Sequence, residues 1–115
     1  MVRRSGDELE LEGTPDELNA LAQLLRLGSG RLDCRVTDPA PYAECLRSIR
    51  VETTRASGSV SVDDDALVLS GDDRARELMA DNIGGGASGQ HQHVEYYEGH
   101  FYLDASSLPL VVSYS

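Results

Sequence analysis

Lysine is absent from this 115-residue chain, so all ten basic residues are arginine, set against twenty aspartates and glutamates. The resulting formal charge of −10 repels phosphate backbones, which argues against direct binding of nucleic acid. The same charge favours association with a basic protein, because electrostatic steering raises association rates by roughly 10–1000-fold at low salt. The plain alternative is that the charge only keeps the protein in solution.

Cysteines and long apolar runs are also scarce. Two cysteines are too few for the disulfide framework of small secreted domains, so we expect Cys34 and Cys45 to be reduced, with Cys34 in the core. The aliphatic stretch at residues 108–112 is far shorter than the about 20 apolar residues that cross a bilayer. An acidic stretch, Gly6-Asp7-Glu8, stands where a secretory signal would be apolar. We therefore expect a cytoplasmic protein without a membrane span.

The length and the 40% hydrophobic content suit one core, which predicts a single domain over residues 1–115. Leu9 and Leu11 alternate with glutamates, a pattern typical of a strand with one buried face. The Thr-Pro-Asp-Glu sequence at 14–17 has the residues of a capped helix start, and Gly28 suits the end of that helix. The chain therefore begins with a strand followed by a helix.

Alternating apolar and polar residues predict further strands at 31–36, 49–53, 60–62 and 67–69. Turn residues separate the last three of these strands, so we expect them to form an antiparallel meander. Carboxylates at Asp72 and Asp73 favour the start of a second helix, and two strands at 91–97 and 108–114 follow a glycine-rich connector. The predicted order is β-α-β-β-β-β-α-β-β.

Nearly every predicted strand has one polar face, whereas strands of all-parallel sheets are apolar on both faces. The predicted fold is therefore α+β, a two-layer sandwich with a mainly antiparallel sheet. We expect both helices on one face of that sheet, which leaves the other face open.

The histidine-rich strand is the most suggestive place for chemistry. His91 and His93 at i and i+2 could share a zinc ion, with Glu95 or His100 completing the site. No Cys-x-x-Cys or His-Glu-x-x-His motif accompanies them, so a polar strand face without metal is the simpler interpretation. A metal-binding regulatory or enzymatic module therefore stays open as the alternative function.

No other motif predicts catalysis. The glycines at 84–86 follow a predicted helix, whereas phosphate-binding loops precede one. Ser88 lacks the Gly-x-Ser-x-Gly spacing of a nucleophile elbow. We therefore expect neither an enzyme nor a bound cofactor.

Five of the six aromatic residues are Tyr42, Tyr96, Tyr97, Phe101 and Tyr102, so four of the six fall within one short C-terminal stretch. Tyrosine is enriched among the interface residues that contribute most to binding. A place in the core is the alternative for Tyr96, Phe101 and Tyr102.

One C-terminal segment resembles a known family. The sequence HVEYYEGHFYL at 93–103, followed by SLPLVV at 107–112, is similar to the C-terminal signature of the immunity protein 32 family, although Phe101 stands where we expect proline. The sequences at 14–18, 38–42 and 80–83 also fit the layout of that family. Its members are small α+β proteins predicted to protect bacteria from polymorphic toxins delivered between cells.

The resemblance implies an intracellular immunity protein, a monomer or homodimer, that binds and neutralises a cognate toxin domain stoichiometrically. The acidic charge predicts that the toxin has a basic surface. The expected partner contacts are the 93–102 segment and polar residues of the open sheet face: Tyr42, His93, Glu95, Tyr97, Glu98, His100, Phe101, Tyr102, Glu8, Glu10, Glu12 and Glu52.

Overall fold

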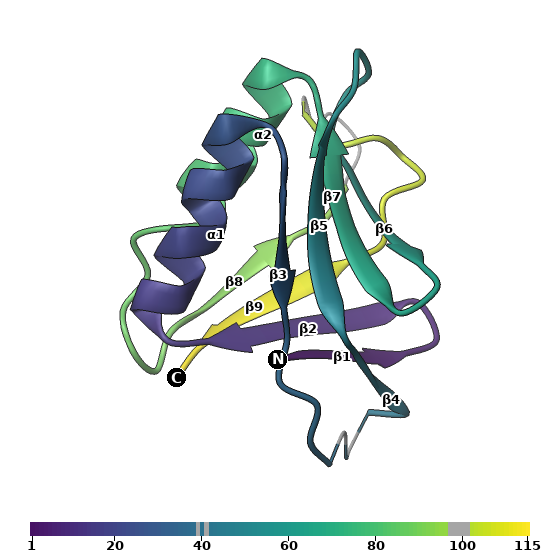
Figure 1. Ribbon diagram of the computed structural model, residues 1–115, viewed down its shortest axis with the longest axis vertical. Helices are drawn as coiled ribbons and strands as arrows, with labels where there is room; N and C mark the ends of the chain where they lie inside the picture. Colours follow the sequence, from purple (N-terminus) through teal and green to yellow (C-terminus); the bar gives the residue numbers. More distant parts are fainter. Residues whose placement is uncertain (39, 41, 97–101) are drawn as a thin grey trace.

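The computed structural model describes the whole chain except residues 39, 41 and 97–101 (Figure 1). Its elements follow one another in the order β1 (Val2–Ser5), β2 (Glu8–Gly13), α1 (Pro15–Leu27), β3 (Gly30–Asp33), β4 (Glu44–Leu46), β5 (Ser48–Thr53), β6 (Ser59–Asp63), β7 (Ala66–Gly71), α2 (Asp73–Ile83), β8 (His91–Val94) and β9 (Leu110–Tyr114). The predicted order of elements is confirmed, and the structure adds the short strands β1 and β4.

The strands form two sheets. Sheet A has the order β4-β1-β2-β9-β8, and only its β2–β9 pair is parallel. Sheet B has the order β3-β5-β7-β6, and only its β5–β7 pair is parallel. Figure 1 shows the strands of the two sheets crossing, with α1 and α2 side by side along one side of the molecule. The predicted α+β sandwich with mainly antiparallel pairing is therefore confirmed.

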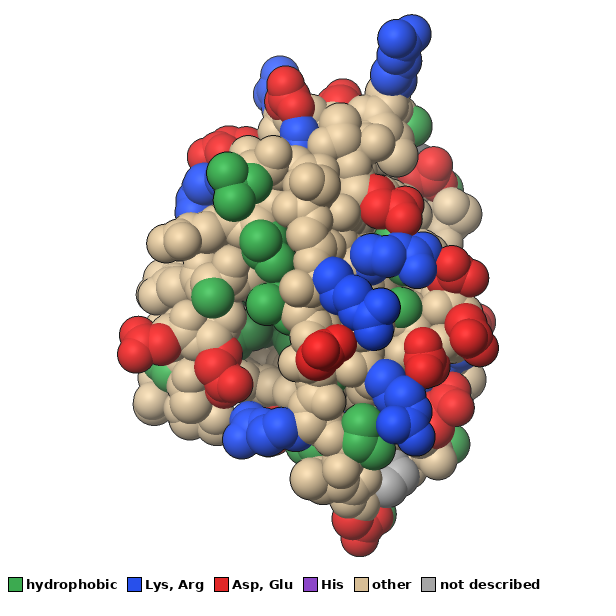
Figure 2. Space-filling model, viewed as in Figure 1, with side chains coloured by type: hydrophobic (Ala, Val, Ile, Leu, Met, Phe, Trp, Pro, Cys, Tyr) green, Lys and Arg blue, Asp and Glu red, His purple; other side chains and the backbone are tan. Residues whose placement is uncertain are grey.

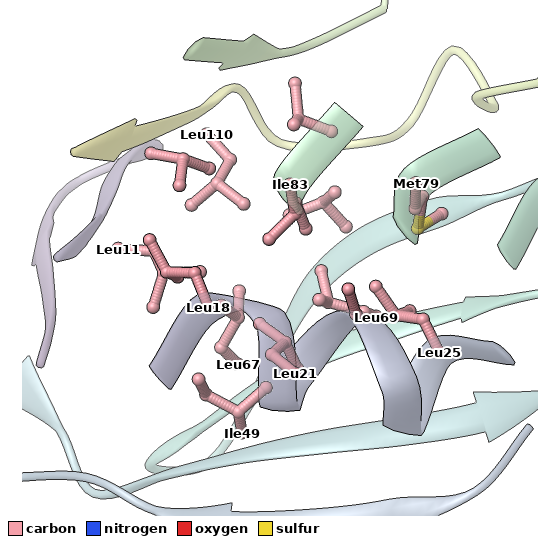
Figure 3. Close-up of a cluster of buried hydrophobic side chains, with 14 of the residues drawn as sticks. Leu11, Leu18, Leu21, Leu25, Ile49, Leu67, Leu69, Met79, Ile83 and Leu110 are labelled. Carbon is pink, nitrogen blue, oxygen red and sulfur yellow. The ribbon is translucent and has the colours of Figure 1, made fainter. Parts of the chain in front are cut away.

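Both sheets and both helices contribute to one cluster of buried side chains. The alternation in β2 places Leu9 and Leu11 in this cluster, and the helical spacing in α1 does the same for Leu18, Leu21 and Leu25. In Figure 3, side chains from α1, α2, sheet A and sheet B converge on the same space. The polar residues that alternate with the buried ones are thereby left on the outer faces of the sheets.

The predicted ends of α1 are confirmed atom by atom. The hydroxyl of Thr14 accepts from the Glu17 N–H at 3.2 Å, and the Glu17 carboxylate accepts from the Thr14 N–H at 2.9 Å. At the other end Gly28 takes the left-handed conformation, with φ 97°, and its N–H donates to the Leu24 carbonyl at 2.9 Å. The capping box and the glycine together fix where this helix begins and ends.

Asp72 caps the start of helix α2, where its carboxylate accepts from the Ala75 N–H at 2.8 Å. Its surface toward α1 includes Arg76, a residue that is only 4% exposed and that the sequence pattern did not single out. The Arg76 guanidinium donates to the Leu25 carbonyl at 2.7 Å and to the Gly71 carbonyl at 3.2 Å, and it also pairs with Asp73. A cation is thus bound at the negative end of the α1 dipole, which joins the two helices.

The predicted antiparallel meander is wrong in part. Strands β6 and β7 do form an antiparallel pair, but β5 pairs with β7 in parallel and does not pair with β6. The reason is the apolar run Ala66 to Leu69 in β7, which is buried on both faces. A meander would leave β7 at the sheet edge, whereas the observed order surrounds it with neighbours.

Both cysteines are free and half-buried. Cys34 packs against the core as expected, and burial raises the pKa of its thiol. Within the described part of the chain, neither helix has the length and apolar character needed to span a bilayer.

Candidate functional site

On the outer face of sheet A, polar side chains of neighbouring strands lie in rows that cross the sheet. Because Leu9, Leu11, Val94, Leu110 and Val112 point into the core, the residues that alternate with them point outward. We call the outward set the acidic face, and it consists of Glu8, Glu10, Glu12, His91, His93, Glu95, Pro109, Val111 and Ser113.

The strand register decides which of these side chains are neighbours. Glu10 lies opposite Val111, and Val111 lies opposite His93, so one row crosses three strands. The next row joins Glu12, Ser113 and His91 in the same way. Glu8 is the first residue of β2 and alternates with Glu10, and Glu95 directly follows the last residue of β8. Residues far apart in the sequence are therefore brought onto one surface.

Arg3 of β1 borders this face and is the cation nearest to its glutamates. It forms an ion pair with Glu10 and lies 3.9 Å from a carboxylate oxygen of Glu12. The side chains of Arg3 and Glu10 are each 15% exposed, so their pair is largely removed from water. The Tyr42 ring covers the Arg3 guanidinium carbon at 5.1 Å from the ring centroid, and the Ala40 carbonyl accepts from Arg3 at 3.3 Å. Arg3 is thus held in place on several sides.

Two carboxylates of the acidic face differ from Glu10. Glu8 and Glu95 are exposed, and among the described residues no arginine lies within ion-pair distance of either. Uncompensated and hydrated carboxylates of this kind can bind an incoming cation without first breaking an internal pair.

The structure brings together five of the residues predicted as contacts: Glu8, Glu10, Glu12, His93 and Glu95. Tyr42 lies beside them, over Arg3. The remaining described candidates are elsewhere. Glu52 belongs to sheet B. Tyr102 lies in the core instead of on the acidic face: its side chain is 8% exposed and its hydroxyl accepts from Asn82 at 3.0 Å. Tyr97, Glu98, His100 and Phe101 fall outside the described residues.

The alternative metal site finds little support. The rings of His91 and His93 are exposed and meet edge to face, with their centroids 5.5 Å apart. In the part of the chain that the structure describes, no three histidine, cysteine, aspartate or glutamate side chains are grouped to hold a metal ion. His100, the fourth residue of that hypothesis, is outside the described part.

The outer face of sheet B is organised differently. Arg50 binds both Glu52, at 2.9 Å, and Asp63, at 2.8 Å, and these hydrogen bonds raise the pKa of the guanidinium above its ordinary value. In the neighbouring strand β3, Arg31 lies 3.3 Å from Asp33 of the same strand. Figure 2 shows positive and negative side chains interspersed on the side of the molecule where Figure 1 draws sheet B. Much of the charge of this face is therefore compensated internally.

A pocket of about 90 Å³ opens between α1 and β3. We call it the α1–β3 pocket. Its inner wall is apolar, with Leu11, Leu18, Leu21, Leu32 and Ile49, and charged residues stand at its rim. Figure 2 shows a hollow with hydrophobic side chains inside it and charged side chains around it. Sequence reasoning missed this pocket because its walls come from four separate elements and no local pattern connects them.

The comparison with known families matches residues 8–27 and 66–115 to the model described as Immunity protein 32. These residues include β2, β8 and β9, the three strands of the acidic face, together with both helices. No curated protein and no solved structure matches the chain. Because the match extends over more than half of the chain and agrees with the resemblance of its C-terminal segment, the chain belongs to the immunity protein 32 family.

Proposed function

We propose that this chain is an intracellular immunity protein that neutralises a cognate toxin domain by binding it stoichiometrically through the acidic face. Family membership supports the toxin-immunity role in general. The observation that supports the docking face is the strand register, which joins Glu10, Glu12, His91 and His93 across β9, with Glu8 on the same face of β2 and Glu95 directly after β8. The inhibitor acts by covering toxin surface, so it needs no catalytic group and no cofactor.

The charge balance supports a basic partner surface. Counting only ion pairs between described residues, at least eight of the ten arginines lie within 4 Å of an aspartate or glutamate, and three of them bind two. Most of the positive charge is thus neutralised locally, and the surplus of acids determines the field around the protein. Lysines and arginines of a toxin would be drawn toward the unpaired carboxylates Glu8 and Glu95.

The geometry of the face suits a protein partner. Three adjacent strands present a surface with a half-buried Val111 near the middle of it and polar residues around it. Stable protein complexes bury about 1,600 Å² in total, with an apolar centre and a polar rim. A toxin that docks here would therefore extend beyond the three strands, toward Arg3 and Tyr42 on one side and past β8 on the other.

Co-expression with the product of the neighbouring gene tests the proposed function. We expect the toxin alone to arrest growth and this chain to restore it. The purified pair should form a complex with one copy of each protein, measured by light scattering and titration calorimetry. The mass of the free chain, measured in the same way, decides between monomer and homodimer. A toxic neighbour that this chain neither binds nor suppresses would remove the proposal.

A further inference from the structure

The α1–β3 pocket is adjacent to the acidic face. Glu12 belongs to both, since it points outward from β2 and also lines the pocket. A second hollow, lined by Met1, Glu12, Arg35 and Thr37, adjoins the pocket and shares the first three of these residues with it. A partner seated on the acidic face would therefore reach the pocket without crossing another part of the molecule.

The pocket has the size and lining of a receptor for one apolar side chain. An enclosed cavity of about 150 Å³ accepts benzene, so about 90 Å³ suits an aliphatic side chain of valine to leucine size. Cys34 and Leu32 form one wall, and leucines of α1 and β2 form the other. Apolar anchors that fill such pockets are the residues on which interface affinity most depends.

The rim of the pocket selects for positive charge next to that side chain. Glu12, Glu17 and Asp33 contribute three carboxylates to the lining, against the guanidinium of Arg35 and the N-terminal ammonium of Met1, which donates to the Glu12 carbonyl at 2.7 Å. Hydrogen bonds from Thr14 lower the pKa of Glu17, which keeps this carboxylate ionised. The Arg35 guanidinium lies 3.5 Å from Glu17 and is 63% exposed, so an incoming cation can compete with it.

We propose that the α1–β3 pocket receives one aliphatic side chain of the toxin, located beside a lysine or arginine that binds the rim carboxylates. The inference rests on the proposed function and adds a second point of attachment to the acidic face. Residues 32–35 and Ile49, which form part of the pocket, lie outside the ranges that match the family model. The pocket therefore gives this chain a contact that the family match alone does not predict.

Filling the pocket from within tests the proposal. Cys34→Leu extends an aliphatic side chain into the space, whereas the control Cys34→Ala leaves it open. We expect Cys34→Leu to raise the Kd for the toxin about tenfold or more and Cys34→Ala to change it less than about threefold. Thermal unfolding of both variants shows whether each remains folded. Equal affinities of two folded variants would overturn the proposal.

Xenon offers a measurement that needs no variant. In the toxin-free wild-type protein, dissolved xenon should shift the methyl resonances of Leu18, Leu21 and Leu32, and saturating toxin should abolish these shifts because its side chain occupies the space. Xenon shifts that persist in the complex, or that are absent from the free protein, would contradict the pocket proposal while leaving toxin binding intact. Failure of the wild-type protein to bind the toxin would instead remove the proposed function and this inference together.

Discussion

The outer faces of the two sheets are both polar, yet they differ in how many of their carboxylates are paired with arginine. On sheet B, Arg50 joins Glu52 and Asp63, and Arg31 joins Asp33, so each acid has a cation at hand. Along sheet A the glutamates outnumber the nearby arginine, Arg3. The net charge of −10 is therefore not spread evenly, since carboxylates remain available where no arginine lies next to them in the same strand or across the sheet.

The two faces also differ in how deeply their central arginine is buried. The Arg3 side chain is 15% exposed and lies under Tyr42, whereas the Arg50 side chain is 38% exposed. A pair that is removed from water cannot be replaced by hydration when one partner is lost, whereas an exposed pair can. The same residue type is therefore structural on sheet A and nearly dispensable on sheet B.

Replacing each arginine by methionine gives the largest expected contrast. Arg3→Met leaves Glu10 half-buried without its cation, and we expect it to lower the free energy of unfolding by about 2–3 kcal/mol, somewhat less than for a fully buried pair. Arg50→Met should lower the free energy of unfolding much less than Arg3→Met does, because Glu52 and Asp63 are exposed to water. Urea denaturation at one pH and salt concentration measures both.

A double variant separates the broken pair from other effects of losing Arg3. In Arg3→Met/Glu10→Leu both charges are removed, so the unpaired carboxylate no longer exists and most of the lost stability should return. If the double variant is as unstable as Arg3→Met alone, the account of a largely buried ion pair is wrong.

Removing the Tyr42 ring should have a smaller effect on stability than removing Arg3. Tyr42→Ala removes the ring from the Arg3 guanidinium, and we expect a loss of about 0.5–1 kcal/mol in unfolding free energy. Repeating the substitution in the Arg3→Met background measures the interaction itself, since the ring then has no cation to cover. An equal loss in both backgrounds would show that Tyr42 acts through packing and not through Arg3.

Glu17, which belongs to neither face, provides the smallest predicted effect. Hydrogen bonds to Thr14 lower its pKa in the folded protein, so ionised Glu17 stabilises the fold above the pH at which a glutamate ordinarily titrates. That contribution is lost as the pH falls through the lowered pKa. In Glu17→Gln this part of the pH dependence should disappear, because glutamine can accept the same hydrogen bond but cannot titrate. Thermal unfolding at a series of acidic pH values measures the difference.

Local features of the fold were predictable from the sequence, and long-range ones were not. Thr14, Glu17 and Asp72 act within one helical turn, so their spacing alone predicts the caps that the structure contains. The parallel pairing of β5 with β7 depends on which neighbours bury the β7 apolar run, and that is a property of the whole sheet. The burial of Arg76 has the same origin, since one of its acceptors is the Leu25 carbonyl in another helix.

The candidate site shows the same division. Alternation in β2 correctly predicts that Glu8, Glu10 and Glu12 share one outward face, and the same holds for His91 and His93 in β8. That β9 joins these two strands into one surface could not be read from either pattern. For Tyr102 the residue type allowed either a partner contact or a place in the core, and the fold buries it in the core.

The affinity of the toxin for two double charge reversals tests the central claim most directly. Glu8→Lys/Glu95→Lys on the acidic face of sheet A and Glu52→Lys/Asp63→Lys on sheet B change the net charge equally, and the sheet B variant in addition breaks the two ion pairs of Arg50. We predict that the sheet A variant raises the Kd about 100-fold or more and that the sheet B variant stays within about threefold of wild type. Equal losses in both variants, or a larger loss from sheet B, would contradict docking through the acidic face.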